Sequence, residues 1–174
     1  LWDGRDLTDL APGARPVAML FQDNNLFPHL TAAENVALAL TPKRRLTVDQ
    51  RRAVDEALDR VGLAGLGGRR PAQLSGGQQG RVALARVLLQ RKPLFLLDEP
   101  FAALGPAQRA EMLDLVATLA REQGASVLMV SHAPEDARRI ADRVVLVAEG
   151  RAEAPAETAA LFADPPPALR AYLG

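Results

Sequence analysis

Two adjacent carboxylates, Asp98 and Glu99, follow the apolar run PLFLL at the end of a predicted strand. Open α/β sheets bind ligands at such strand ends, where a carboxylate can hold Mg²⁺ directly or through water. The second carboxylate could orient a water molecule and take its proton during attack on a phosphate. The alternative interpretation is an acidic cluster that only stabilises the start of the following helix.

The pentapeptide LSGGQ at 74–78 starts a predicted helix with two glycines in its first turn. Ser75 and Gln78 have the spacing of a capping box, which by itself explains an ordinary helix start. Paired glycines weaken a helix start, however, and are most useful where the backbone must approach a ligand closely. Free amides, the helix dipole and a Ser hydroxyl favour a terminal phosphate at Ser75, Gly76, Gly77 and Gln78.

Two more polar residues follow predicted strands. His132 comes after the apolar run SVLMV, and Gln22 ends the run PVAMLF. Because the carboxyl ends of parallel strands share one sheet edge, both side chains are expected near Asp98, where an imidazole could contact a phosphate oxygen. Each has a plain alternative, since a lone His is more often structural and a Gln at a strand end is uninformative by itself.

Short apolar runs alternate with helical patterns along the chain, which predicts an α/β fold with a parallel sheet and crossover helices. The predicted strands span 16–22, 93–97, 126–130 and 143–147. The run 93–97 is continuous enough to be buried on both faces, and 126–130 is also predicted to be buried. The predicted helices begin near 31, 47, 75, 106 and 134, and the tail from Ala152 is predicted to form a peripheral helix and a loosely held end.

The composition excludes several classes of protein. With 174 residues, 48% of them hydrophobic and 24% charged, the chain can bury a core and is not disordered. Basic and acidic residues balance at 21 each, so no global field attracts nucleic acid or an anionic membrane. There is no cysteine for a disulfide or a thiolate metal site, and no apolar run long enough to span a membrane.

In combination and in this order, the motifs resemble the ATP-binding cassette (ABC) ATPases. Gln22 is similar to the Q-loop glutamine, LSGGQ to the signature motif, LFLLDEP to the Walker B strand and His132 to the switch histidine. The resemblance covers almost the whole chain. It implies a RecA-like P-loop NTPase core formed by 1–27 and 93–150, an inserted α-helical subdomain at 28–92, and a C-terminal tail at 151–174.

The resemblance also implies a role for each motif. Asp98 and Gln22 would act on Mg²⁺, Glu99 would be the general base for the attacking water, and His132 would contact the γ-phosphate of ATP. LSGGQ would clasp the ATP held by the opposite subunit of a homodimer. Such an ATPase lies at the cytoplasmic face of the bacterial inner membrane, coupled to integral membrane permease subunits and indirectly to a periplasmic or extracellular substrate-binding protein, without nucleic acid.

A phosphate loop of the form G-x-x-x-x-G-K-[ST] does not occur in the 174 residues, because neither Lys43 nor Lys92 is followed by Ser or Thr. Since the chain starts at Leu1 rather than Met, we expect this loop and the first strands to lie upstream. The chain alone is then expected to bind ATP poorly and to be inactive.

Two glycines also depart from the family pattern. Gly105 stands where the family has the D-loop aspartate, which puts communication between the two ATP sites in question. Gly80 interrupts the signature helix and predicts a loss of about 0.5–1 kcal/mol at the helix start.

The 51 residues from 23 to 73 suit the compact helical subdomain of transporter subunits rather than the long insertions of DNA-repair and chromosome-structuring relatives. A single cassette without a membrane span resembles the ATPase of a bacterial importer. The stretch LFQDNNLFPHLTAAENVALAL and the pattern at 128–143 are similar to ATP-binding subunits for thiamine import, and subunits for polyamine, sulfate, iron or molybdate import share most of these residues.

Two other classes of function stay open. A non-catalytic fragment or pseudo-ATPase that only docks on a permease or dimerises is favoured by the absent phosphate loop and by Gly105. The intact Gln22, Glu99 and His132 disfavour it. A soluble ATPase acting on nucleic acid is disfavoured by the zero net charge.

Overall fold

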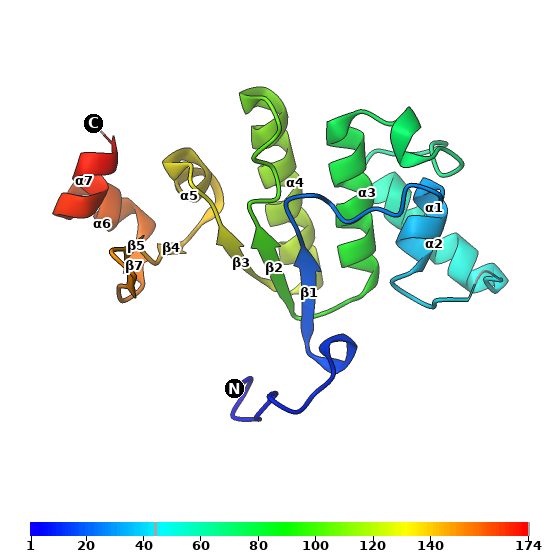
Figure 1. Cartoon of the computed structure of the whole chain (residues 1–174), viewed down its shortest axis with the longest axis horizontal. Coiled ribbons are helices and arrows are strands. Elements are labelled where there is room, and N and C mark those ends of the chain that lie inside the picture. The colour runs from blue at the N-terminus through cyan, green and yellow to red at the C-terminus, as the bar shows by residue number, and fades with distance from the viewer. Residues whose placement is uncertain (44, 174) are drawn as a thin grey trace.

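The computed structural model describes residues 1–43 and 45–173 (Figure 1). Its centre is a three-stranded parallel sheet with the order β1-β2-β3. A short 3₁₀ turn (Pro12–Ala14) leads into β1 (Val17–Leu20), and the other two strands are β2 (Leu94–Asp98) and β3 (Ser126–Val130). Because the strands are parallel, their carboxyl ends form a single edge, as the α/β prediction requires.

Three helices lie between β1 and β2 in the sequence and pack against one another (Figure 1). They are α1 (Ala32–Ala37), α2 (Val48–Arg60) and α3 (Gly76–Leu89), the last preceded by a 3₁₀ turn (Pro71–Gln73). Each helix begins at a capping box, with N-caps at Thr31, Thr47 and Ser75. The predicted helix starts at 31, 47 and 75 are therefore confirmed.

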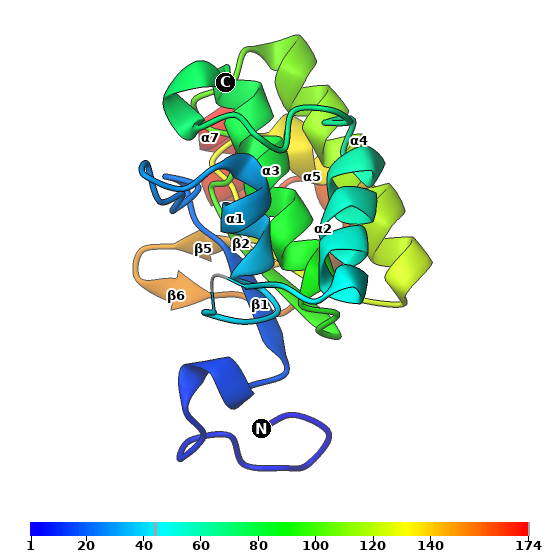
Figure 2. The same cartoon turned by 90° about the vertical axis from the view of Figure 1, so that its right-hand side faces the viewer.

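The helix α4 (Pro106–Gln123) connects β2 to β3. It begins with Pro106 in its first turn and ends at Gly124, whose φ of 64° is left-handed and suits a residue without a Cβ. Together with α3 it lies on one side of the sheet, as Figure 2 shows from the right-hand side of Figure 1. The alternate side chains of β1 and β2 on that side, such as Leu20 and Phe95, are buried in the main core.

The other face of the sheet is open. Met19 of β1 is 43% exposed and Leu128 of β3 is 58% exposed, although both are apolar. The prediction of a buried strand is therefore wrong for 126–130, where no residue is fully buried, while in 93–97 Phe95 and Leu97 are buried and Leu96 on the opposite face is half-buried. The physical reason is that α3 and α4 both lie on the same side, and no element of the described chain covers the opposite side.

The chain after β3 forms short elements at the left of Figure 1. They are α5 (Pro134–Ile140), β4 (Arg143–Val144), β5 (Val147–Ala148), β6 (Arg151–Ala152), β7 (Ala156–Glu157), α6 (Thr158–Ala163) and α7 (Pro167–Leu173). The single strand predicted at 143–147 is divided, because β4 pairs with β7 and β5 with β6, both antiparallel. The β5–β6 turn consists of Glu149 and Gly150, both with positive φ, which is the geometry of a tight hairpin.

The C-terminal tail is attached more firmly than the sequence predicts. The Thr158 hydroxyl donates a hydrogen bond of 2.6 Å to the carbonyl of Ala141, and Leu169 of α7 is buried. The Tyr172 hydroxyl donates a hydrogen bond of 2.5 Å to the main-chain carbonyl of His132. The expectation of a loosely held end is wrong, because these contacts tie the tail to α5 and to the loop after β3.

Candidate functional site

The acidic pair lies at the carboxyl end of the central strand. Asp98 is the last residue of β2 and is exposed, and the amide of Glu99 donates a hydrogen bond of 3.1 Å to Val130, continuing the pairing with β3. Glu99 has a φ of 43°, in the left-handed region that disfavours a residue with a Cβ. Such a conformation costs about 1–3 kcal/mol and clusters at active sites, although it also occurs in tight turns such as the one at Glu149.

His132 contacts Glu99 directly. The imidazole Nε2 lies 2.6 Å from Oε1 of Glu99, so the two side chains are in direct polar contact. The imidazole is 77% exposed, so packing does not hold it in this position. The structure thus brings together a group that can accept a proton and a group that can donate a hydrogen bond, the two roles needed around an attacking water and a phosphate oxygen.

Gln22 lies two residues beyond β1, exposed, at the same edge of the sheet. The loop after it bends through Asn24 and Asn25, whose φ values of 57° and 45° are left-handed. Arg86 of α3 donates hydrogen bonds of 2.8 Å to the carbonyls of both asparagines. Burial lowers the pKa of the Arg86 guanidinium. The loop that carries Gln22 is therefore fastened to the helix that LSGGQ begins.

The LSGGQ segment forms the start of α3 as a capping box. The Ser75 amide donates to Oε1 of Gln78 at 2.9 Å, and the Gln78 amide donates to the Ser75 hydroxyl at 3.3 Å. A Cβ at Gly77 would lie 3.8 Å from Oε1 of Gln108, so the segment runs beside the start of α4. Gly105 is the N-cap of α4 and provides no side-chain cap. No hydrogen bond among the described residues joins LSGGQ to Glu99 or His132.

The oxygen donors at the sheet edge suit magnesium held together with a phosphate. The described residues contain no group of three or more His, Cys, Asp or Glu side chains that could hold a metal ion by themselves. Mg²⁺ is commonly bound through one or two carboxylates, with substrate phosphates and water completing its octahedron. The carboxylate of Asp98 and the amide oxygen of Gln22 fit that requirement.

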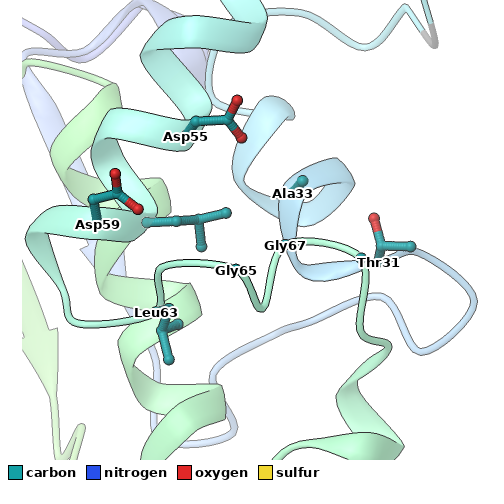
Figure 3. Close-up of a pocket in the computed structure, with 9 residues that line it drawn as sticks. Thr31, Ala33, Asp55, Asp59, Leu63, Gly65 and Gly67 are labelled. Atoms are coloured by element: carbon teal, nitrogen blue, oxygen red, sulfur yellow. The ribbon is translucent and has the colours of Figure 1, made fainter.

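One cavity of the described chain lies away from this edge of the sheet. It has a volume of about 510 Å³ and lies among α1, α2 and the loop 63–68, where Asp55 and Asp59 of α2 line it (Figure 3). None of the predicted site residues lines it. Because two carboxylates would repel a polyphosphate, this cavity is a poor nucleotide site.

Sequence reasoning missed the side chains that support the predicted site. Arg86 fastens the loop after Gln22, and Asp136 of α5 is a buried carboxylate that contacts Arg109 and Ser131. The available signal was the run PEDARRIA, where one carboxylate shares the inner face of a short helix with apolar residues. Tyr172 carried no such signal, because only the folded tail brings it to His132.

Comparison with known proteins decides the family. A family model described as "ABC transporter" matches residues 1–102, more than half of the chain. The chain belongs to the ABC transporter family. The same ABC transporter chain is 67% identical over 174 residues to the thiamine import ATP-binding protein ThiQ of Cereibacter sphaeroides, and 63% identical to the protein of that name from Ruegeria sp.. It is covered completely in both comparisons and spans 75% of each relative's length.

Solved structures of ABC proteins share the fold. One is the dimeric, post-hydrolysis ATP-binding cassette MJ0796 bound to ADP and Pi, with a TM-score of 0.75 and 32% identity over 90% of this chain and 71% of that one. Another is cbiO1 of Clostridium perfringens, part of the transporter complex cbiONQ, with a TM-score of 0.76 and 29% identity over 86% of this chain and 60% of that one. The fold of this ABC transporter chain is that of the RecA-like ABC ATPases.

Proposed function

We propose that this ABC chain is the ATP-hydrolysing subunit of a bacterial thiamine importer. The observation that carries the enzymatic part is the 2.6 Å contact between His132 and Glu99 at the carboxyl edge of the sheet. The substrate is proposed from the relatives, since the thiamine import ATP-binding protein of Cereibacter sphaeroides is 67% identical across the whole chain. Three relatives that share this name favour thiamine over the alternatives of polyamine, sulfate, iron or molybdate.

In the proposed reaction Glu99 orients a water molecule and accepts its proton, while His132 donates a hydrogen bond to an oxygen of the γ-phosphate. A positioned general base contributes about 10²–10⁴-fold to a rate. A magnesium ion held by Asp98 and Gln22 would neutralise charge on the phosphate oxygens. The strained backbone of Glu99 supports this assignment, because φ values of this kind concentrate at functional sites.

The partner of this chain is proposed to be a second copy. Ser75, Gly76, Gly77 and Gln78 would contact ATP bound to the opposite subunit, using free amides at the start of α3. The dimeric, nucleotide-bound relative supports this arrangement.

The division of the chain stays a proposal, with 28–92 as a helical subdomain supported by the mutual packing of α1, α2 and α3. Residues 1–27 and 93–150 would form the core, and 151–174 the tail.

We also propose that this chain docks on permease subunits at the cytoplasmic face of the membrane, through the loop after Gln22. A substrate-binding protein would be engaged only indirectly. No helix of the described residues has both the length and the apolar character to cross a membrane. A separate permease would supply the membrane-spanning part.

Uptake of labelled thiamine by cells tests the substrate. The chromosomal gene is replaced by its Glu99→Gln variant, and uptake of thiamine, spermidine, sulfate, iron and molybdate is compared with the parent strain. We expect thiamine uptake alone to be lost. Undiminished thiamine uptake together with the loss of another solute would overturn the substrate assignment. Absence of ATP hydrolysis from the full-length wild-type protein would favour the non-catalytic alternative.

A further inference from the structure

A buried carboxylate lies close behind the His132 loop. Asp136, in the first turn of α5, is 4% exposed, and three donors surround its two oxygens. Arg109 of α4 donates from Nε to Oδ1 at 2.7 Å and from Nη2 to Oδ2 at 2.5 Å. The Ser131 hydroxyl donates to Oδ2 at 2.6 Å. A bidentate Arg–carboxylate pair with an additional hydrogen bond is among the most firmly oriented polar arrangements in proteins.

The Ser131 hydroxyl links the Asp136 carboxylate to the backbone around His132. Its oxygen accepts a hydrogen bond of 3.0 Å from the Ala133 amide and one of 3.1 Å from Nη2 of Arg109. The residues on both sides of His132 are thus fixed by a single hydroxyl that is itself bonded to Asp136. The Tyr172 hydroxyl also bonds to the His132 carbonyl, from the other side of the loop. Because packing does not hold the exposed imidazole, its position depends on the backbone that these hydrogen bonds fix.

We propose that Asp136 and Arg109 are positioning residues that act through Ser131 to hold His132 in reach of Glu99. The inference rests on the proposed function, because it concerns the same reaction. It adds a buried ion pair whose removal misplaces the imidazole while leaving the other nucleotide-contacting side chains intact. A misplacement of about 1 Å can cost on the order of 10²-fold in rate.

The competing explanation is that Arg109–Asp136 merely joins α4 to α5. The chain offers a matched control, because Arg139 of α5 and Asp114 of α4 form an ion pair of 2.6 Å between the same two helices. That pair is exposed and has no contact with the His132 loop among the described hydrogen bonds. Asp114→Asn therefore removes a helix-joining ion pair without touching the Ser131 cluster.

The test measures MgATP hydrolysis by the full-length gene product and its variants. For Asp136→Asn we expect kcat to fall about 10- to 100-fold with KM unchanged within about threefold, because the substrate contacts remain. Asp114→Asn should keep the wild-type kcat. Ser131→Ala should reproduce the loss and Ser131→Thr, which keeps the hydroxyl, should restore most of the rate. These serine variants keep the test valid if Asp136→Asn does not fold.

A double-mutant cycle separates positioning from simple stability. In a His132→Gln background, Asp136→Asn should cause no further loss, because the residue acts only through the imidazole. An equal loss in both backgrounds, or an equal effect of Asp114→Asn, would overturn the proposal.

A wild-type protein without ATPase activity would reject the proposed function, and hydrogen exchange would then decide the inference by itself. Faster exchange of the Ala133 amide in Asp136→Asn but not in Asp114→Asn supports it, and unchanged exchange overturns it.

Discussion

The imidazole Nε2 of His132 lies 2.6 Å from Oε1 of Glu99, although the two residues follow different strands. Their contact is a consequence of sheet order, because β2 and β3 are parallel neighbours and each residue lies just past the end of its strand. Glu99 reaches this position with a left-handed backbone and His132 with an imidazole that packing does not hold. The pair is therefore maintained by the backbone on both sides.

The backbone strain at Glu99 predicts that replacing this proposed general base by glycine increases stability while it removes activity. Glu99→Gly should raise the free energy of unfolding by about 0.5–1 kcal/mol, since relief of the left-handed penalty exceeds the entropic cost of glycine. Glu99→Ala keeps the Cβ and should give no such gain. Urea unfolding of the three proteins measures this, and a Gly variant less stable than the Ala variant would show that the backbone is not strained.

Arg86 is predicted to be essential for the loop that carries Gln22. In Arg86→Gln both carbonyls of Asn24 and Asn25 lose a charged donor, which should lower the unfolding free energy by about 2–4 kcal/mol. Arg86→Lys can restore one of the two bonds and should cost less. Chemical denaturation of both variants measures whether Arg86→Gln is less stable than Arg86→Lys. Equal stability of the Gln variant and the wild type would contradict the role of Arg86 in holding the loop after Gln22.

How far the sequence predicts this molecule can be argued from single residues. The capping boxes at Thr31, Thr47 and Ser75 locate three helices correctly, because side-chain to backbone capping is a local interaction. Local patterns fail where burial is decided by distant elements. The apolar run around Leu128 predicts a core residue, yet Leu128 is exposed because no described helix lies over its side of the sheet (Figure 2).

In the candidate site, too, contacts that follow from local sequence and strand pairing are predictable, and contacts between distant elements are not. Strand ends and motif spacing predict that Glu99 and His132 share one edge, since that follows from parallel pairing alone. The partners Asp136 and Tyr172 could not be predicted in this way, because their contacts depend on how α5 and α7 dock. One strand predicted at 143–147 became two, since β6 and β7 supply separate antiparallel partners.

Gly80 is expected to be replaceable. The helix α3 continues through it without a break, and a Cβ there would lie 3.8 Å from both Oδ1 of Asn24 and Cε of Met112, which is ordinary contact. Gly80→Ala should therefore raise the unfolding free energy by about 0.5–1 kcal/mol, because glycine loses more backbone entropy on folding. Thermal and urea unfolding measure the gain, and a loss would mean that α3 and the loop at Asn24 cannot accept a methyl group.

The surface pair Arg139–Asp114 gives a prediction on pH. The hydrogen bond from Arg139 holds the pKa of Asp114 below its ordinary value of 3.8. A carboxyl whose pKa is lower in the folded state stabilises the protein above the unfolded value and loses that contribution as the pH falls through the folded value. The stability difference between wild type and Asp114→Asn should therefore be present at neutral pH and disappear below 3.8.

NMR titration of the Asp114 carboxyl provides the independent check. In the Arg139→Gln variant its pKa should return toward 3.8, because the main cause of the shift is gone. A carboxyl that titrates identically in both proteins would show that the pair does not persist in solution.

Steady-state hydrolysis of MgATP by the full-length gene product and its Glu99→Gln variant tests the central assignment most directly. The substitution keeps the size of the side chain and removes its ability to take a proton from water. We predict a fall in kcat of about 10²–10⁴-fold, with KM unchanged within about threefold. An undiminished kcat would contradict the assignment of Glu99 as the general base.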